Sequence, residues 1–158
     1  IARGEKMDWI VQKATELGVV RILPVVSERS EVRLDGERAD RRVAHWREVA
    51  ISACEQSGRA VLPAVVAPST LDHAATLRDG PGFVLDPLAE GASRTLAATL
   101  TSACTLAIGP EGGWSARDLE QLHAAGFIGL RLGQRILRTE TAGIAAIAAL
   151  QALAGDLG

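Results

Sequence analysis

Two stretches near the carboxyl end of the chain, LAIGPEGGWSARDLE (residues 106–120) and LRLGQRILRTETAG (130–143), decide how this sequence folds. In each stretch a short apolar run ends at a glycine-bearing turn, and the residues that follow are typical of a helix. A strand followed by a loop and a helix, twice in close succession, is typical of a parallel sheet. We therefore expect both loops to leave the carboxyl ends of neighbouring strands.

Strand-like and helix-like segments alternate along the whole chain. Short apolar runs bounded by turn residues predict buried strands, and apolar positions repeated at helical spacing predict helices. The expected strands cover residues 19–26, 60–66, 82–86, 104–109 and 128–133. The expected helices cover residues 7–17 and 38–56, a short segment from residue 70, and residues 92–100, 115–126 and 139–155. This order predicts an α/β fold with a mostly parallel sheet flanked by helices, in a single domain over residues 1–158.

The last expected helix is apolar on nearly every side. From Ala142 to Leu153, Gln151 is the only polar side chain. A helix of this kind needs cover all round its surface, either from its own core or from another subunit. We expect it to contribute to a homodimer interface, because a terminal helix rarely finds complete cover within one chain.

Composition and charge exclude several classes of protein. The 158 residues carry a formal net charge of −2, which argues against a domain that grips nucleic acid through bulk positive charge but leaves room for a local basic face. Aromatic residues make up 3% of the chain, too few for a base-stacking platform. No apolar run is long enough to span a membrane, so no membrane association is expected.

The cysteines and histidines give no sign of a metal site. Cys54 and Cys104 lack metal-ligand spacing and lie among apolar residues, so we expect both to be core residues in the reducing cytoplasm. His45, His73 and His123 are scattered along the chain, and we expect them on helices or at the surface. No bound metal is expected.

The first loop, GPEGGWS (109–115), has the backbone features of a binding loop. Pro110 stiffens the turn, and Gly112 and Gly113 allow the backbone to approach a ligand without an intervening Cβ. Ser115 opens an S-x-x-D capping box that starts the next helix. The loop lacks the glycine spacing of a dinucleotide site and the lysine and hydroxyl of a phosphate-binding loop. On these residues alone, a plain strand-to-helix turn with a good cap is an equal interpretation.

The second loop leaves an expected strand end at Leu132 and Gly133 and leads to Thr139, an expected helix cap. Open α/β sheets bind ligands at the carboxyl ends of their strands, so the two loops together are expected to form one site. Between them they supply apolar walls, a cation and carboxylates: Leu132, Ile136, Leu137, Arg138, Glu111 and Glu140. This mixture suits a small ligand with polar and apolar parts, such as a nucleoside, better than it suits a phosphate.

The two loops also carry a family resemblance. GPEGGWS (109–115) followed by LGQRILRTETA (132–142) resembles the signature of the RsmE family of 16S ribosomal RNA uracil-N3 methyltransferases, within the SPOUT superfamily. KATELGVVRILPVVSERSEV (13–32) resembles the first helix, strand and loop of that family, and ACEQSGRAVLP (53–63) resembles its E-Q-x-x-R segment. The resemblance covers nearly the whole chain.

The resemblance has implications for the fold, the cofactor and the partners. It implies a SPOUT-type sheet whose C-terminal part forms a deep trefoil knot, a homodimer, and S-adenosylmethionine held in a bent shape by the knot loops. The implied substrate is N3 of a uridine in the 16S ribosomal RNA of the small ribosomal subunit, in the cytoplasm. Family members carry an N-terminal PUA-like β-barrel that helps to bind RNA, and nothing ahead of IARGEKMDWIV (1–11) could form one. We therefore expect the chain to be the catalytic domain of a longer protein.

The resemblance also implies which residues bind the cofactor and which act on the substrate. The implied cofactor-binding residues are Leu85, Gly109, Pro110, Glu111, Gly112, Gly113, Leu132, Gly133, Ile136, Leu137 and Arg138. Because N3 of uracil carries a proton, the reaction needs a base and a cation that stabilises charge on the flanking carbonyl oxygens. Arg138 is the candidate charge stabiliser and Glu140 the candidate base. Alternatively, Arg138 pairs with Glu140 or Glu111, Glu140 is a cap or an ion-pair partner, and Glu111 braces its own loop.

RNA contacts are expected from the first helix and from segments that follow it. Lys6, Trp9, Lys13 and Glu16 share one stripe beside the apolar face of that helix. The candidate RNA-binding residues are Lys13, Arg29, Arg33, Glu55, Gln56 and Arg59. The cations among them would contact phosphates, whereas Glu55 and Gln56 would read the target nucleotide or line the cleft. A charged stripe of this kind is also what an ordinary solvated helix face presents.

Other functions stay open on the sequence. A SPOUT-type methyltransferase that acts on a different RNA base or on a ribose 2′-hydroxyl is the nearest alternative. A non-catalytic module with the same fold, used for binding or dimerisation, is a second alternative. A phosphate-binding hydrolase has little in its favour, since the sequence shows no nucleophile–base pair or metal cluster.

Overall fold

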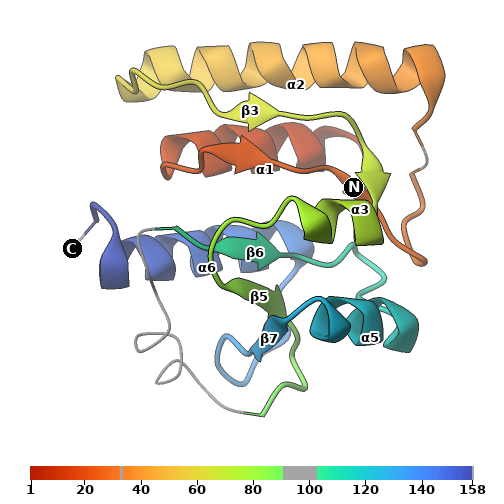
Figure 1. The fold of residues 1–158 in the computed structure, drawn as a ribbon. Coiled ribbons are helices and arrows are strands. Elements are labelled where there is room, and N and C mark those ends of the chain that lie inside the picture. The colour runs from red at the N-terminus through yellow and green to blue at the C-terminus, as the bar shows by residue number, and fades with distance from the viewer. Residues whose placement is uncertain (33, 91–102, 158) are drawn as a thin grey trace.

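The computed structural model of the chain describes residues 1–32, 34–90 and 103–157 (Figure 1). Its helices are α1 (Glu5–Glu16), α2 (Gly36–Ser57), α3 (Leu71–Thr76), α5 (Ala116–Ala124) and α6 (Thr139–Ala154). Its strands are β1 (Arg21–Ile22), β2 (Val25–Val26), β3 (Ala64–Val65), β4 (Ser69–Thr70), β5 (Gly82–Leu85), β6 (Thr105–Ala107) and β7 (Phe127–Leu130). The helix expected over residues 92–100 lies outside the described residues.

All pairings between the described strands are parallel. Strand β5 lies between β6 and β7, while β1 pairs with β3 and β2 pairs with β4. Helices alternate with these strands along the chain, so the prediction of an α/β fold built on parallel sheets is confirmed. Phe83 and Val84 in the central strand β5 are 1% and 0% exposed, as expected for a strand covered on both faces.

The apolar run over residues 19–26 forms two short strands, so the prediction of one continuous strand is wrong. Pro24 separates β1 from β2, and proline cannot donate a ladder hydrogen bond. The chain changes partner at this point, from β3 to β4, and the carbonyl of Pro24 accepts a hydrogen bond from the Ser69 amide. Strand β4 was not predicted, because two residues carry no periodic pattern. Strand β3 likewise begins only after Pro63.

Several helix ends agree with the sequence, and one differs. Helix α2 ends before Gly58, whose backbone is left-handed, and the side chains of Ser115 and Asp118 form the expected capping box of α5. Thr139 was expected to cap the last helix, but the cap position belongs to Arg138, whose side chain makes no capping hydrogen bond. The preceding strand β7 ends at Leu130, two residues earlier than expected. The loop between β7 and α6 is therefore longer than the sequence suggested.

Buried apolar side chains form three clusters among the described residues. In Figure 1, α2 and α1 lie above α6, and β5, β7 and α5 lie below it. The upper cluster packs α1 against α2 around Val11, Trp46 and Ala50, which are at most 1% exposed. The lower cluster packs α5 and β7 against β5, with Leu122 and Val84 at its centre. The third cluster packs Leu150 of α6 against Phe83 of β5 and Leu130 of β7.

We expect Trp46 to dominate the upper core. Its ring is 1% exposed, and its Nε1 donates a hydrogen bond of 3.1 Å to Oδ1 of Asp8. Trp46→Ala removes a large buried ring, so the free energy of unfolding should fall by about 3–5 kcal/mol in urea denaturation. Trp9 is 43% exposed on α1, and Trp9→Ala should cost less than about 1 kcal/mol. Equal losses in the two variants would contradict this picture of the core.

Candidate active site at the carboxyl ends of the parallel strands

A cavity of about 320 Å³ opens at the carboxyl ends of β5, β6 and β7. We call it the strand-end cavity. Three loops and the first turns of α1 and α6 form its wall. The lining residues are Lys6, Leu85, Asp86, Pro87, Ile108, Gly109, Pro110, Glu111, Gly113, Trp114, Leu130, Arg131, Leu132, Arg135, Ile136, Leu137, Arg138, Thr139, Glu140 and Ala142.

The structure brings most of the predicted cofactor-binding residues together around this cavity. The residues that line it are Leu85, Gly109, Pro110, Glu111, Gly113, Leu132, Ile136, Leu137 and Arg138. The two candidate catalytic residues, Arg138 and Glu140, line it as well. Gly112 and Gly133 do not. The two loops therefore meet as expected, and the roles assigned to their residues stay predictions.

Lys6 of α1 joins the two loops electrostatically. Its Nζ lies 3.4 Å from Oε1 of Glu111 in the β6–α5 loop and 4.0 Å from Oε2 of Glu140 in the first turn of α6. Oε1 of Glu111 also accepts a hydrogen bond of 3.2 Å from the amide of Arg3. The start of α1 is thus fixed to both loops, an arrangement that no sequence pattern indicated.

The environment of Glu111 favours its charged form. Partial burial acts to raise the pKa of this carboxyl group. Hydrogen bonds from the Glu111 and Arg3 amides and from the Lys6 ammonium outweigh burial, so the pKa lies below its ordinary value of 4.5. The interpretation of Glu111 as a brace for its loop agrees with these contacts.

Arg138 is left without the partners that were considered for it. Glu111 and Glu140 both face Lys6, and the Arg138 side chain has no ion pair or hydrogen bond among the described residues. An exposed guanidinium at the wall of a cavity is available to a ligand. The alternative of a structural salt bridge from Arg138 to either glutamate is not what the structure contains.

Two buried polar atoms beside the cavity have no hydrogen-bond partner among the described residues. They are Nε1 of Trp114, a donor, and Oε2 of Glu140, an acceptor. A buried polar group without a partner costs roughly 1–3 kcal/mol, so native structures normally satisfy such groups with water or a ligand. The Trp114 ring also explains Gly109, because a Cβ there would lie 3.3 Å from Trp114 Nε1.

Gly112 supports the first loop from behind. Nη1 of Arg29 donates a hydrogen bond of 3.1 Å to the Gly112 carbonyl, and a Cβ on Gly112 would lie 3.3 Å from Cβ of Arg29. The missing side chain therefore makes room for Arg29. Arg29, predicted to bind RNA, contacts the loop instead of standing free.

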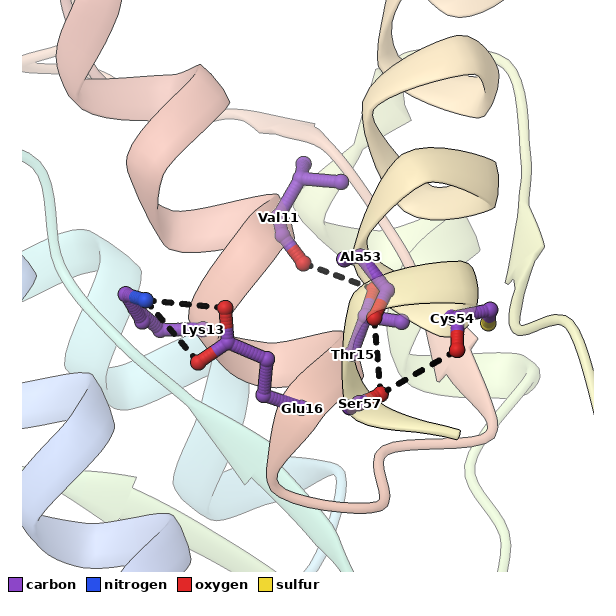
Figure 2. A network of polar contacts seen from close by, with 7 residues as sticks. All are labelled: Val11, Lys13, Thr15, Glu16, Ala53, Cys54 and Ser57. Carbon is purple, nitrogen blue, oxygen red and sulfur yellow. Dashed lines mark hydrogen bonds and ion pairs between the residues drawn. The ribbon is translucent and has the colours of Figure 1, made fainter. Parts of the chain in front are cut away.

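Lys13 and Arg59, also predicted to bind RNA, do not line the strand-end cavity. Figure 2 shows the Lys13 ammonium directed at Glu16 on the same helix, at 2.8 Å, on the side of α1 turned away from Thr15. Arg59 donates to the carbonyls of Thr15 and Gly18, at 2.7 and 3.3 Å. The charged groups of Lys13 and Arg59 therefore bind groups at the end of α1.

Glu55 and Gln56 of the predicted RNA-binding set do not line the cavity. Glu55 and Gln56 are exposed on α2, and Arg33 lies outside the described residues. The RNA role of the whole set stays a prediction.

Sequence reasoning missed several residues of the cavity wall. Asp86 and Pro87 directly follow β5, so the strand-end rule that identified the other two loops would also have found them. Arg131 was passed over because the second loop was expected to start later, and Arg135, inside that loop, was not singled out. Lys6 was placed on the charged stripe of the first helix, but nothing indicated that it reaches the two loops, since α1 is distant from both in sequence.

The cysteines and histidines lie where they were expected. Cys54 is buried, and burial raises the pKa of the half-buried, free Cys104 thiol. His45, on α2, makes a hydrogen bond of 2.9 Å with Asp8.

Within the described ranges, no His, Cys, Asp and Glu side chains gather as metal ligands do. None of the helices in that part of the chain has the length and apolar character needed to cross a bilayer.

The fold and the cavity together define a class of protein. Parallel strands whose loops enclose a ligand-sized cavity at one edge are the arrangement by which α/β proteins bind nucleotide-like cofactors. A family model described as RNA methyltransferase domain matches residues 1–151. The chain belongs to this family.

Relatives and solved structures agree with this assignment. Ribosomal RNA small subunit methyltransferase E of Buchnera aphidicola (subspecies Schizaphis graminum) is 38% identical over 99% of this chain and 64% of the relative. The enzyme of that name from Bacillus subtilis is 31% identical over 95% and 62%. The chain thus spans slightly less than two thirds of these relatives.

Two of the similar solved structures contain a cofactor. Ribosomal RNA small subunit methyltransferase E from Neisseria gonorrhoeae, bound to S-adenosyl methionine, matches with a TM-score of 0.91 and 41% identity over all of this chain and 65% of that one. A Legionella pneumophila protein in complex with the bound cofactor SAM matches with a TM-score of 0.90 and 37% identity, over 96% and 63%. Both cover the region that contains the strand-end cavity.

Glu111 should make stability depend on pH in the acid range. Because its folded pKa is depressed, its stabilising contribution is complete above 4.5 and disappears as the pH falls through the lower folded value. Urea denaturation of Glu111→Gln should therefore show a stability deficit, below about 1 kcal/mol, that is constant near neutral pH and shrinks below about pH 4.5. Glu120→Gln, on the exposed face of α5, is the matched control. A deficit that grows in acid would contradict the assignment.

Proposed function

We propose that the chain is the catalytic domain of an S-adenosylmethionine-dependent methyltransferase that modifies N3 of a uridine in 16S ribosomal RNA. The observation that carries this proposal is the strand-end cavity, which is formed by the two predicted loops in a chain of the RNA methyltransferase domain family. The similar structures with bound S-adenosylmethionine support the choice of cofactor. The curated relatives support ribosomal RNA as the substrate class.

The cavity has the size and chemistry that this cofactor needs. Its volume of about 320 Å³ lies at the lower end of the range for ligand pockets. Apolar side chains such as Ile108, Leu132 and Leu137 suit the adenosine rings. The carboxylates of Glu111 and Glu140 are opposite in sign to a sulfonium group, and Trp114 Nε1 and Glu140 Oε2, which have no hydrogen-bond partner among the described residues, can bond to ligand atoms.

The reaction needs positioning, a base and charge stabilisation. When bound, S-adenosylmethionine supplies an electrophilic methyl carbon on a leaving group that departs neutral. The chain holds the two reactants in line, which converts a bimolecular step into an oriented one. Glu140 accepts the proton from uracil N3, and Arg138 stabilises the negative charge that develops on the adjacent carbonyl oxygen.

Calorimetry tests the cofactor part of the proposal. Titration of S-adenosylmethionine, or of its demethylated product, into the chain should release or absorb heat with a stoichiometry of one ligand per chain. A folded chain that gives no heat with either compound would reject the cofactor assignment. Mass analysis of modified nucleosides then separates uracil-N3 methylation from ribose or guanine methylation, and a module that binds but never transfers would give no methylated product.

Arg138 should be essential for methyl transfer. Arg138→Ala removes the cation that faces the developing charge, so transfer to small ribosomal subunits should fall by about 10²–10³-fold. The assay counts methyl groups transferred from labelled cofactor. Arg117→Ala, an exposed arginine on α5 outside the cavity wall, should keep its rate. Equal rates in the Arg138→Ala variant and the unchanged chain would remove Arg138 from the mechanism.

The finer features of the family complete the proposal. They are a single domain, a C-terminal trefoil knot, residence in the cytoplasm, and action without a metal or a membrane. A homodimer is supported by α6, where Ala145, Ala152 and Leu153 are exposed and Ile144 and Ile147 are only half-buried. An apolar helix with that much open surface needs another partner.

The dimer has its own measurement. Sedimentation equilibrium should give twice the 16.6 kDa mass of one chain. Leu153→Glu should shift the equilibrium toward the monomer, because it places a charge in an apolar contact. A monomer at all concentrations would exclude this part of the proposal.

A further inference from the structure

Three arginines of the β7–α6 loop form what we call the arginine rim: Arg131, Arg135 and Arg138. All three side chains line the strand-end cavity and are exposed. None has an ion pair or hydrogen bond among the described residues. Three free cations within eight residues, at the mouth of one cavity, are costly through mutual repulsion unless an anion meets them.

Six of the ten other arginines that the structure describes have a polar partner. The described arginines with an ion pair or a carbonyl partner are Arg3, Arg21, Arg29, Arg47, Arg59 and Arg78. Residues 128–139 contain no acidic side chain, and the acidic residues that line the cavity, Asp86, Glu111 and Glu140, make no ion pair with the rim. The free arginines Arg41 and Arg42 on α2 instead have Glu37 and Asp40 as close neighbours in sequence.

The rim is a poor match for the cofactor and a good match for RNA. S-adenosylmethionine carries a sulfonium and an ammonium against one carboxylate, so a set of three cations would on balance repel it. The backbone of RNA places one negative charge on every nucleotide, and guanidinium groups bind phosphates with paired hydrogen bonds. The sign of the rim therefore indicates the acceptor strand.

An exposed apolar side chain within the rim points the same way. Ile136 lies between Arg135 and Arg138 in sequence, lines the cavity and is 84% exposed. The apolar side chain of Ile136 is unfavourably exposed to water in that position. Against a nucleoside, it offers the apolar surface on which a base or ribose can rest while neighbouring guanidiniums hold the phosphates.

We propose that Arg131 and Arg135 of the arginine rim bind backbone phosphates of the RNA strand that enters the strand-end cavity. The proposal rests on the function proposed above and names the surface of that site that meets the substrate. It moves the main RNA contact away from the face expected from the sequence, where Lys13 is paired with Glu16 and Arg59 binds the end of α1. Arg138 serves the reacting base, while Arg131 and Arg135 hold the flanking backbone.

Fluorescence anisotropy with a fluorescein-labelled, single-stranded RNA oligonucleotide containing uridine tests the rim. The double variant Arg131→Gln/Arg135→Gln should bind at least about tenfold more weakly than the unchanged chain at low salt. The slope of log affinity against log salt concentration should become shallower by about 1.4, because each phosphate contact on a single strand contributes about 0.7. Arg41→Gln/Arg42→Gln makes the same change in net charge on α2 and should alter the slope by less than half as much.

The outcomes separate this inference from the proposed function. Equal effects of the two double variants, an unchanged slope in the rim variant, or no measurable RNA binding by the unchanged chain would each overturn the rim. Calorimetry with the demethylated cofactor should give the rim variant the affinity of the unchanged chain, and a circular dichroism spectrum should confirm its fold. Rim-dependent RNA binding in a chain that binds no cofactor would sink the proposed methyl transfer and leave the rim standing.

Discussion

The parallel pairing of β5 with both of its neighbours is the constraint on which the site depends. Val84 lies opposite Ala107 of β6 on one side and opposite Gly129 of β7 on the other, so all three strands end at the same edge. Two loops separated by a helix in sequence are thereby forced into contact. Phe83 and Val84, covered on both faces, hold this edge in place. The cavity follows from the register of the sheet before any side chain in it is considered.

The charges around the cavity are divided between two kinds of wall. Glu111 and Glu140 share one ammonium, that of Lys6, and so keep a net negative character toward the interior. The rim arginines line the same cavity and make no ion pair among the described residues. A cationic cofactor and an anionic polymer would thus meet surfaces of opposite sign within one site. This division would let a small acidic domain bind both the cofactor and the RNA without a large basic surface.

Much of the fold was predictable from the sequence, because local signals and global architecture agree. Apolar runs and glycine turns identified β5, β6 and β7, and the rule that ligands bind at strand ends joined the correct two loops. The split at Pro24 and the start of α6 depend on single hydrogen bonds, which patterns of hydrophobicity do not resolve. The position of Lys6 at the cavity could not be predicted, since its partners come from loops more than 100 residues away. Contacts of that range are a product of the fold and leave no trace in spacing.

The start of helix α1 forms part of the site, and this has a consequence for protein engineering. The amide of Arg3 and the ammonium of Lys6 both donate hydrogen bonds to Oε1 of Glu111. If the two glycine loops were grafted onto another scaffold, Glu111 and Glu140 would lose the ammonium group of Lys6 that pairs with both of them. The two loops would then be expected to separate. The smallest unit that could be transplanted is therefore discontinuous. It comprises the opening turns of the first helix and the C-terminal third of the chain.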